Sequence, residues 1–242
     1  NNPLKQLSPR ISASYKLTDR FNINFNTGLY YQTPAYTMLG FRDSNNIYIN
    51  KQANLRYIQC AHLVGGIEYS SQKNARFTIE AFYKKYAHYP QSTNRGISLA
   101  NSGGDFGVVG NEAVQSISEG RAYGIEFFAQ QKLTKRFFGV FSYTWFKSEY
   151  TNANNQYTAS SWDNNHLLSL TCGYKFNKNW ELGLKFRYQG AVPFTPFDDA
   201  ASRANYLTLG QGTLNYSQIN SQRLNAFNAS DIRIDKKWNY KK

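Results

Sequence analysis

The sequence has little of several features that would point to other protein classes. Its 242 residues include 2 cysteines, 1 methionine and 6 prolines. No stretch approaches the roughly 20 consecutive apolar residues of a membrane-spanning helix, which excludes an α-helical membrane protein. The sequence also has no initial methionine and no recognisable targeting segment. We therefore expect it to be a fragment of a longer polypeptide.

Acidic residues are scarce relative to basic ones, with 15 against 28 and a formal net charge of +13. A nucleic-acid-binding protein would gather such charge into a patch or stripe. Here the basic residues are scattered, so no nucleic-acid partner is expected. Cys60 and Cys172 lie in separate predicted strands without metal-ligand spacing. We expect them to be unpaired, and we expect neither a metal site nor a cofactor.

Aromatic residues are abundant, with 19 tyrosines and 17 phenylalanines, and they favour strands. The segment FFGVFSYTWFKSEY (137–150) would place Phe137, Phe141 and Trp145 on one face of an extended chain. A soluble β-sandwich could contain such a strand. So could a membrane barrel, because its strands are apolar only at alternate positions, which is compatible with the mean hydropathy of -0.61.

Alternation with a period of two predicts nine strands of about ten residues each. They cover residues 8–18, 21–32, 57–70, 75–86, 119–132, 137–149, 166–176, 180–190 and 227–238.

The predicted connections alternate between short and long. The short ones are 18–20, 71–74, 134–136 and 177–179, and the long ones are 33–56, 87–118, 150–165 and 191–226. In an up-and-down meander, alternate connections lie at the same end of the sheet. Outer-membrane barrels have such short periplasmic turns and long extracellular loops, whereas a Greek-key sandwich has no reason to alternate. The sequence therefore predicts an all-β, transmembrane, antiparallel up-and-down β-barrel.

The two faces of the predicted strands differ in polarity. In 21–32, Phe21, Ile23 and Phe25 alternate with Asn22 and Asn24. A polar group without a partner costs several kcal/mol in a bilayer, so the polar face should line the lumen and the aromatic face should contact lipid and lipopolysaccharide. Aromatic residues near both strand ends predict two interfacial girdles. The charged residues predicted in the lumen are Arg76, Glu80, Glu126, Arg187, Asp231 and Arg233.

Three stretches carry a family resemblance: GRAYGIEFFAQQKLTKRFFGVFSYTWFKSEY (120–150), WDNNHLLSLTCGYKFNKNWELGLKFRYQGAVPFTP (162–196) and SQRLNAFNASDIRIDKKWNYKK (221–242). They resemble the C-terminal barrel portion of TonB-dependent outer-membrane receptors, in the style of Bacteroidetes members. The matching motif residues, in order, are Gly124 and Glu126; Ser142 to Thr144; Trp162, Asp163 and His166; Gly190, Pro193, Thr195 and Pro196; and Asp231, Arg233 and Asp235.

The resemblance implies a 22-stranded barrel of the bacterial outer membrane, plugged by an N-terminal domain and energised by the TonB complex. Such receptors import scarce nutrients such as ferric siderophores, cobalamin, glycans or peptides. Residues 1–242 would then form about nine strands of one barrel domain, with the plug domain and the final strands absent. The implied partners are that plug, the remaining strands, the TonB complex and a possible surface lipoprotein. In the family, lumen charges meet the plug or one another.

The long loops are where ligand contacts are expected, because loops commonly carry specificity. The candidates are Tyr36, Phe41, Tyr48, Phe106 and Tyr206, together with Arg42, Arg95 and Arg203 for anionic ligands. Mutual packing of loop aromatics is an equally good explanation.

No catalytic constellation is visible, so no enzymatic activity is expected. The histidines are His62, His88 and His166, and only His166 has an acidic neighbour nearby, Asp163. We expect this pair to make a structural hydrogen bond. The stretch NSGGDFGVVGNE (101–112) lacks the lysine and hydroxyl residue of a phosphate loop and is expected to be part of a long loop.

The sequence leaves two alternatives to a TonB-dependent receptor open. One is a passive porin or structural outer-membrane barrel, and the other is a soluble β-rich binding module.

Overall fold

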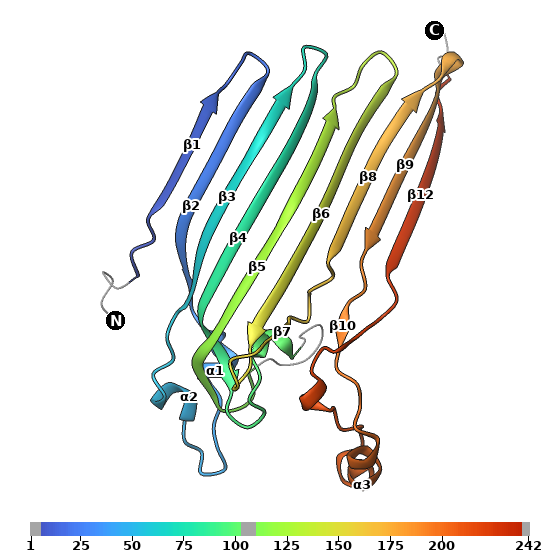
Figure 1. The fold of residues 1–242 in the computed structure, drawn as a ribbon. Coiled ribbons are helices and arrows are strands. Elements are labelled where there is room, and N and C mark those ends of the chain that lie inside the picture. Colours follow the sequence, from blue (N-terminus) through green and yellow to red (C-terminus); the bar gives the residue numbers. More distant parts are fainter. Residues whose placement is uncertain (1–5, 103–109, 239–242) are drawn as a thin grey trace.

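The protein is one antiparallel sheet with an elaborate layer of loops at one end (Figure 1). The structure is a computed structural model that describes residues 6–102 and 110–238. The order of the strands in the sheet is β1-β2-β3-β4-β5-β6-β8-β9-β12, with short β7 beside β6. Their bounds are Arg10–Lys16 (β1), Phe21–Gln32 (β2), Ile58–Ser70 (β3), Ala75–Ser92 (β4), Val114–Gln131 (β5), Phe137–Thr151 (β6), Tyr157–Ala159 (β7), His166–Lys175 (β8), Trp180–Gln189 (β9) and Phe227–Lys236 (β12).

All nine predicted strands are confirmed, but two of them are longer than expected. Strand β4 continues to Ser92 and β5 already begins at Val114, so the predicted loop 87–118 is shorter. The register shifts between Tyr86 and Pro90, where His88 adopts a positive φ of 60°. Pairing resumes beyond this irregularity, with Gln91 opposite Gln115. A bulge interrupts the alternation on which the prediction of the strand end rested.

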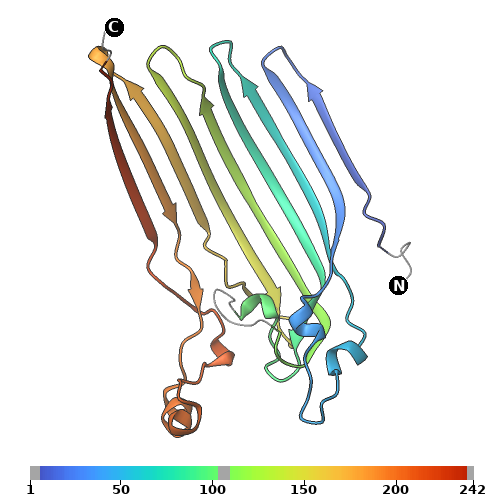
Figure 2. The ribbon, with the colours of Figure 1, turned by 180° about the vertical axis from the view of Figure 1, so that it is seen from behind.

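The predicted asymmetry of the two rims is confirmed. The four tight turns lie together at one end of the sheet and the four long connections lie at the other (Figure 2). At two tight turns a threonine hydroxyl accepts the next strand's first amide, Thr18 from Phe21 at 3.1 Å and Thr134 from Phe137 at 3.0 Å. These hydrogen bonds stabilise the reversal of the chain within the turn, so a longer connection is not needed.

The long connections contain helices that the sequence analysis did not predict. These are α1 (Tyr36–Leu39), α2 (Ile49–Gln52), α3 (Asp199–Leu209) and the 3-10 helices η2 (Leu99–Asn101) and η4 (Tyr216–Gln218). The last long connection also contains a pair of short strands, β10 (Pro193–Phe194) and β11 (Gln222–Arg223). At the opposite rim, η3 (Asn177–Asn179) forms one of the tight turns. The carboxylate of Asp198 caps α3 by accepting the Ala201 amide at 2.9 Å. Within the described ranges, no helix is both long and apolar enough to cross a membrane.

The register aligns like residues across the sheet and creates two chemically distinct faces. We call one the apolar face; a row of directly opposed residues on it runs Ile23, Ile67, Ile79, Phe127, Tyr143, Leu168 and Tyr188. We call the other the polar face; its neighbouring row runs Asn24, Gly66, Glu80, Glu126, Thr144, Leu167 and Gln189. The alternation in sequence is thus kept in register from strand to strand.

Aromatic residues on the apolar face form two bands. Near the tight turns, Tyr69 lies between Phe21 and Phe77, with ring centroids 4.9 and 6.2 Å away. Closer to the long connections, Tyr123 lies between Tyr83 and Trp145 at 6.4 and 6.3 Å. Two bands at different heights on one face have the arrangement of interfacial girdles in outer-membrane barrels.

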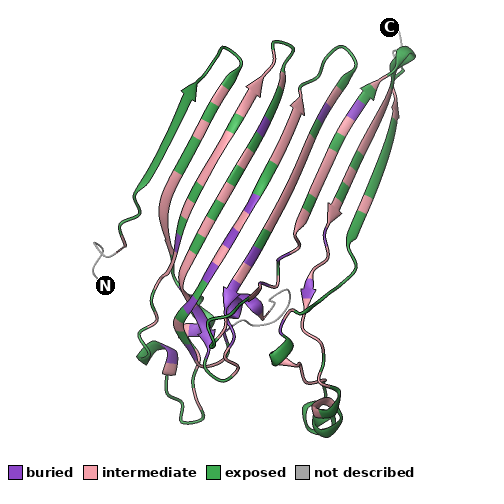
Figure 3. Cartoon of the chain, in the orientation of Figure 1, coloured by how far each residue is buried: buried purple, intermediate pink, exposed green. Residues whose placement is uncertain are grey.

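The small hydrophobic core lies where the first two long connections meet the ends of β4 and β5. Met38, Leu99 and Val114 are buried together, and Leu55 and Tyr89 pack against them. Figure 3 shows the buried residues gathering at the end of the sheet that carries the long connections. The loop layer, which we define as residues 33–57, 93–102, 110–113, 152–165 and 190–226, is therefore a packed structure.

Candidate functional site: the polar wall and the loop layer

Two carboxylates face each other at the middle of the polar face. Glu80 on β4 lies directly opposite Glu126 on β5, and the next residues in the row are Gly66 on β3 and Thr144 on β6. Neither carboxylate forms an ion pair with another described residue. Like charges directly opposite each other destabilise a sheet. A cation near both carboxylates would relieve this repulsion, and the described strands do not supply one.

The other four predicted lumen charges also lie on the polar face, and each has a partner. Arg76 pairs with Glu68 at 2.7 Å, and Arg233 pairs with Asp235 at 2.8 Å. Arg187 lies 3.9 Å from Asp231 across β9 and β12. The arginines are all at least half-exposed, so solvent screens these pairs and they contribute little to stability. Their contact with a plug stays a prediction.

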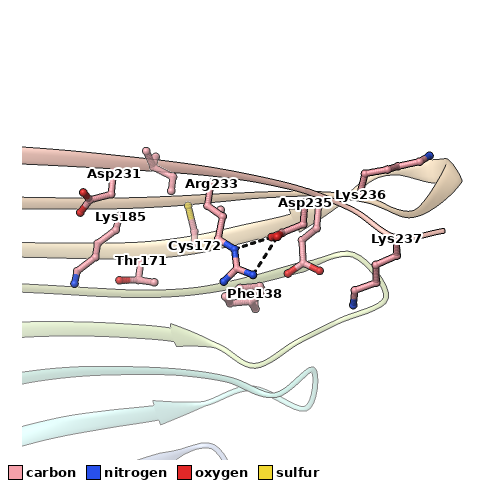
Figure 4. A pocket seen from close by; sticks show the side chains of 12 residues that line it. Phe138, Thr171, Cys172, Lys185, Asp231, Arg233, Asp235, Lys236 and Lys237 are labelled. Carbon is pink, nitrogen blue, oxygen red and sulfur yellow. Dashed lines mark hydrogen bonds and ion pairs between the residues drawn. The ribbon is translucent and has the colours of Figure 1, made fainter.

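A hollow of about 540 Å³ lies in this wall near the tight-turn end. Gly183 lines it and lies directly opposite Gly173 on β8, with Phe138 and Arg233 on the flanking strands. A Cβ atom at Gly173 would lie 2.3 Å from the Phe138 ring, so glycine lets that ring lie across β8. Figure 4 shows Arg233 between Phe138 and Asp235, with Lys185 and Asp231 further along the hollow. The hollow thus presents charges of both signs.

A buried asparagine joins the first two long connections. Asn50 is fully buried, and its amide nitrogen donates to the carbonyls of Met38 at 2.9 Å and Glu112 at 2.8 Å. Its carbonyl oxygen accepts the Val114 amide at 2.9 Å. One side chain therefore satisfies backbone groups from both connections and fixes them over the end of β5.

Asp163 and Arg223 join the last two long connections. The Asp163 carboxylate is 3% exposed, accepts the Ser148 amide at 2.7 Å and pairs with the Arg223 guanidinium at 2.6 Å. The same guanidinium donates to the carbonyl of Ala191 at 2.9 Å. The predicted hydrogen bond between Asp163 and His166 is wrong, because His166 lies 2.9 Å from the Tyr143 hydroxyl instead. A salt bridge between residues 60 positions apart overrides the local pairing.

A cleft of about 540 Å³ opens between three segments of the loop layer, 95–97, 152–158 and 216–221. We call it the amide cleft because four carboxamide side chains line it: Asn152, Asn154, Gln156 and Gln218. Its only charged lining residue among those described is Arg95, which forms an ion pair with Glu112 and contacts the Tyr216 ring.

Arg95 keeps its charge in the cleft. Burial alone would lower the pKa of the Arg95 guanidinium, but hydrogen bonds to Glu112 and Tyr216 hold that pKa above its ordinary value. The Glu112 carboxylate also accepts from the Ser92 hydroxyl. The charge is therefore compensated within the loop layer.

The seven predicted ligand residues that the structure describes do not converge on one site. Arg42 stacks 4.0 Å from the Tyr48 ring in the first long connection, where Tyr36 is exposed and Phe41 half-buried. Arg203 and Tyr206 are exposed on α3, which both ribbon views place apart from α1 and α2. Phe106 lies outside the described residues. Of the seven described, only Arg95 lines the amide cleft.

Sequence reasoning missed the amides of this cleft. Four of the five residues from Asn152 to Gln156 are asparagine or glutamine, and that density within one connection was the available signal. Gln218 gave no such signal, because only folding brings it to the same cleft.

No curated protein sequence matches this chain. A model of the TonB-dependent receptor-like β-barrel family matches residues 1–238. The chain belongs to this family. TonB-dependent receptor barrels lie in the bacterial outer membrane, so the apolar face of this sheet is its lipid side and the polar face its lumen side. The family resemblance of the three stretches is confirmed.

Solved structures share the fold of this TonB-dependent receptor barrel. The ferric-catecholate import receptor Fiu from E. coli K12 matches over 95% of this chain and 28% of its own, with 15% identity and a TM-score of 0.64. The ferripyoverdine receptor of Pseudomonas aeruginosa matches over 94% and 26%, with 14% identity and a TM-score of 0.63. The FrpB iron transporter from Neisseria meningitidis matches over 95% and 32%, with 11% identity and a TM-score of 0.59.

The chain thus spans about a quarter to a third of the length of these three receptors. Binding of iron or of ferric compounds is a property of those three receptors. At such low sequence identity, the similarity shows only that the fold is shared.

Proposed function

We propose that this chain is part of an outer-membrane transporter that imports a scarce nutrient by TonB-dependent active transport. The observation that carries the proposal is the family match over residues 1–238. The structure supports it with a sheet that has one lipid-compatible face, one polar face and an elaborate rim at a single end. In this proposal the strands form part of a larger barrel, the loop layer captures the nutrient, and a plug domain outside this sequence closes the lumen.

The polar face supports the presence of a plug. Glu80 and Glu126 oppose each other without a cationic partner among the described residues. A basic side chain from a plug would supply the missing charge and form charge-assisted hydrogen bonds with both carboxylates. A water-filled porin lumen would leave the two carboxylates solvated, which is tolerated but provides no reason for placing them side by side.

The electrical conductance of the intact receptor distinguishes a plugged transporter from a passive porin. Purified from the outer membrane and inserted into a planar bilayer, the wild-type protein is expected to show no stable conductance, because the plug fills the lumen. The double variant Glu80→Gln/Glu126→Gln should open at least about tenfold more often, since two charge-assisted hydrogen bonds weaken. Asp19→Asn, in an exposed tight turn, is the control and should remain closed.

A stable open pore in the wild-type protein would contradict the transporter and favour a passive porin. Recovery of the intact polypeptide from the membrane-free fraction would instead favour a soluble binding module.

A further inference from the structure

We propose that the amide cleft binds an uncharged, polyhydroxylated ligand of the oligosaccharide class. This inference rests on the proposed function, since it assigns the nutrient class to a site in the loop layer. Its volume of about 540 Å³ falls within the usual range for small-ligand sites.

The cleft is preformed. The Asn152 carbonyl oxygen accepts the amides of Asn154 at 2.9 Å and Gln156 at 3.0 Å, which holds the turn after β6 in one shape. The Ala153 amide donates to the Gly96 carbonyl at 2.7 Å and ties this turn to the preceding connection. Gly96 adopts a φ of 66°, where glycine avoids strain. Ile219, which also lines the cleft, is buried.

The polar groups that face the cleft remain available. The side-chain amides of Asn154, Gln156 and Gln218 make no hydrogen bond with any described residue, and neither does the Ser221 hydroxyl. A carboxamide offers two donors and an acceptor with two lone pairs. Paired hydroxyl groups, each both donor and acceptor, match this set. The half-buried Tyr216 ring adds an aromatic surface of the kind that packs against the C–H face of a sugar.

Charge argues against an anionic ligand in this cleft. A carboxylate, phosphate or ferric chelate of negative charge would need an uncompensated cation. Arg95 supplies the only lining cation among the described residues, and Glu112 already neutralises it. Binding an anion there would require breaking that pair.

The hydrogen bonding of the backbone around the cleft argues against a peptide ligand. Extended peptides commonly bind by adding a strand to an edge with free backbone groups. In this cleft the backbone groups are largely used internally: Asn152 donates to Gln156 at 3.0 Å and Ser221 donates to Gln218 at 3.2 Å. The cleft presents mainly side chains, which suits a ligand recognised through hydroxyls.

Direct binding tests the assignment independently of transport. The intact receptor in detergent would be applied to an array of neutral oligosaccharides from α-glucan, β-glucan, mannan and xylan, beside acidic oligosaccharides, ferric siderophores and peptides. At least one neutral oligosaccharide should bind, and calorimetry should show affinity reduced at least about tenfold in Gln156→Ala/Gln218→Ala, because several hydrogen bonds are lost. The matched control is Gln211→Ala, an exposed glutamine of the same layer outside the cleft.

Failure of the assignment and failure of the proposed function are distinguishable. Absence of neutral saccharide binding, or binding that the double variant leaves unchanged, would overturn the assignment. Preferred binding of an acidic saccharide, ferric siderophore or peptide would overturn it as well. Saccharide binding by a protein that forms a stable open pore would support the assignment while contradicting TonB-dependent transport.

Discussion

Replacing Arg223 by alanine is expected to release the last long connection, residues 190–226, from the rest of the loop layer. The Asp163 carboxylate, which is 3% exposed in the wild-type protein, would still accept the Ser148 amide but would lose its cation. Loss of one partner of a buried ion pair costs about 3 to 5 kcal/mol. Arg223 is partly exposed, so we expect about 2 to 3 kcal/mol, which raises the opening of this connection about 30- to 150-fold.

Hydrogen exchange of the intact receptor measures this opening. Amides of residues 190–226 should exchange faster in Arg223→Ala, whereas those of β2 and β3 should not change. Arg223→Lys keeps the charge but loses the forked geometry and should lie between the two. Arg203→Ala, on exposed α3, is the matched control. Exchange in Arg223→Ala equal to that of wild type would show that the ion pair does not hold the loop layer together.

An arginine in place of Phe141 is expected to block assembly of the barrel. Phe141 lies on the apolar face of β6, opposite Ala129 and Leu170, and its ring is 5.7 Å from that of Phe127. A cationic side chain on the lipid side of an outer-membrane barrel costs about 2 to 4 kcal/mol near the bilayer midplane. Loss of the aromatic contact adds about 1 kcal/mol.

The next residue provides the matched control. Ser142 lies on the polar face, between Phe128 and Ser169, so Ser142→Arg points into the lumen. Folded protein in the outer membrane, measured by heat-dependent migration in gel electrophoresis, should fall sharply in Phe141→Arg and little in Ser142→Arg. Urea unfolding in lipid vesicles should rank the variants in the same order. Equal tolerance of both substitutions would contradict the assignment of the faces.

The sheet could be predicted from sequence because its signals are local. Alternation with a period of two, as in Phe21, Ile23 and Phe25, depends only on neighbouring residues, and so does the length of each turn. The ends of β4 and β5 could not be predicted, because a bulge near His88 lets pairing resume in a new register. Bulges depend on the partner strand as much as on the bulged one.

The loop layer could not be predicted for the opposite reason, since long-range contacts determine it. Asn50 bonds Glu112, and Arg223 bonds Asp163, each pair about 60 positions apart in sequence. Arg95 was predicted to contact an anionic ligand, which stays a prediction, and residue type alone could not reveal its ion pair with Glu112. The clustering of Asn154, Gln156 and Gln218 likewise depends on how the connections fold over one another.

The central claim is that this sheet is the wall of an outer-membrane barrel, with lipid on one face and the lumen on the other. Spin labels placed singly along β9, from Leu182 to Arg187 in a receptor lacking Cys60 and Cys172, test it most directly in native-like lipid. We expect high collision rates with membrane-dissolved oxygen at Leu182, Leu184 and Phe186, and low rates at Gly183, Lys185 and Arg187. Uniform rates along the strand, or the reverse alternation, would contradict it.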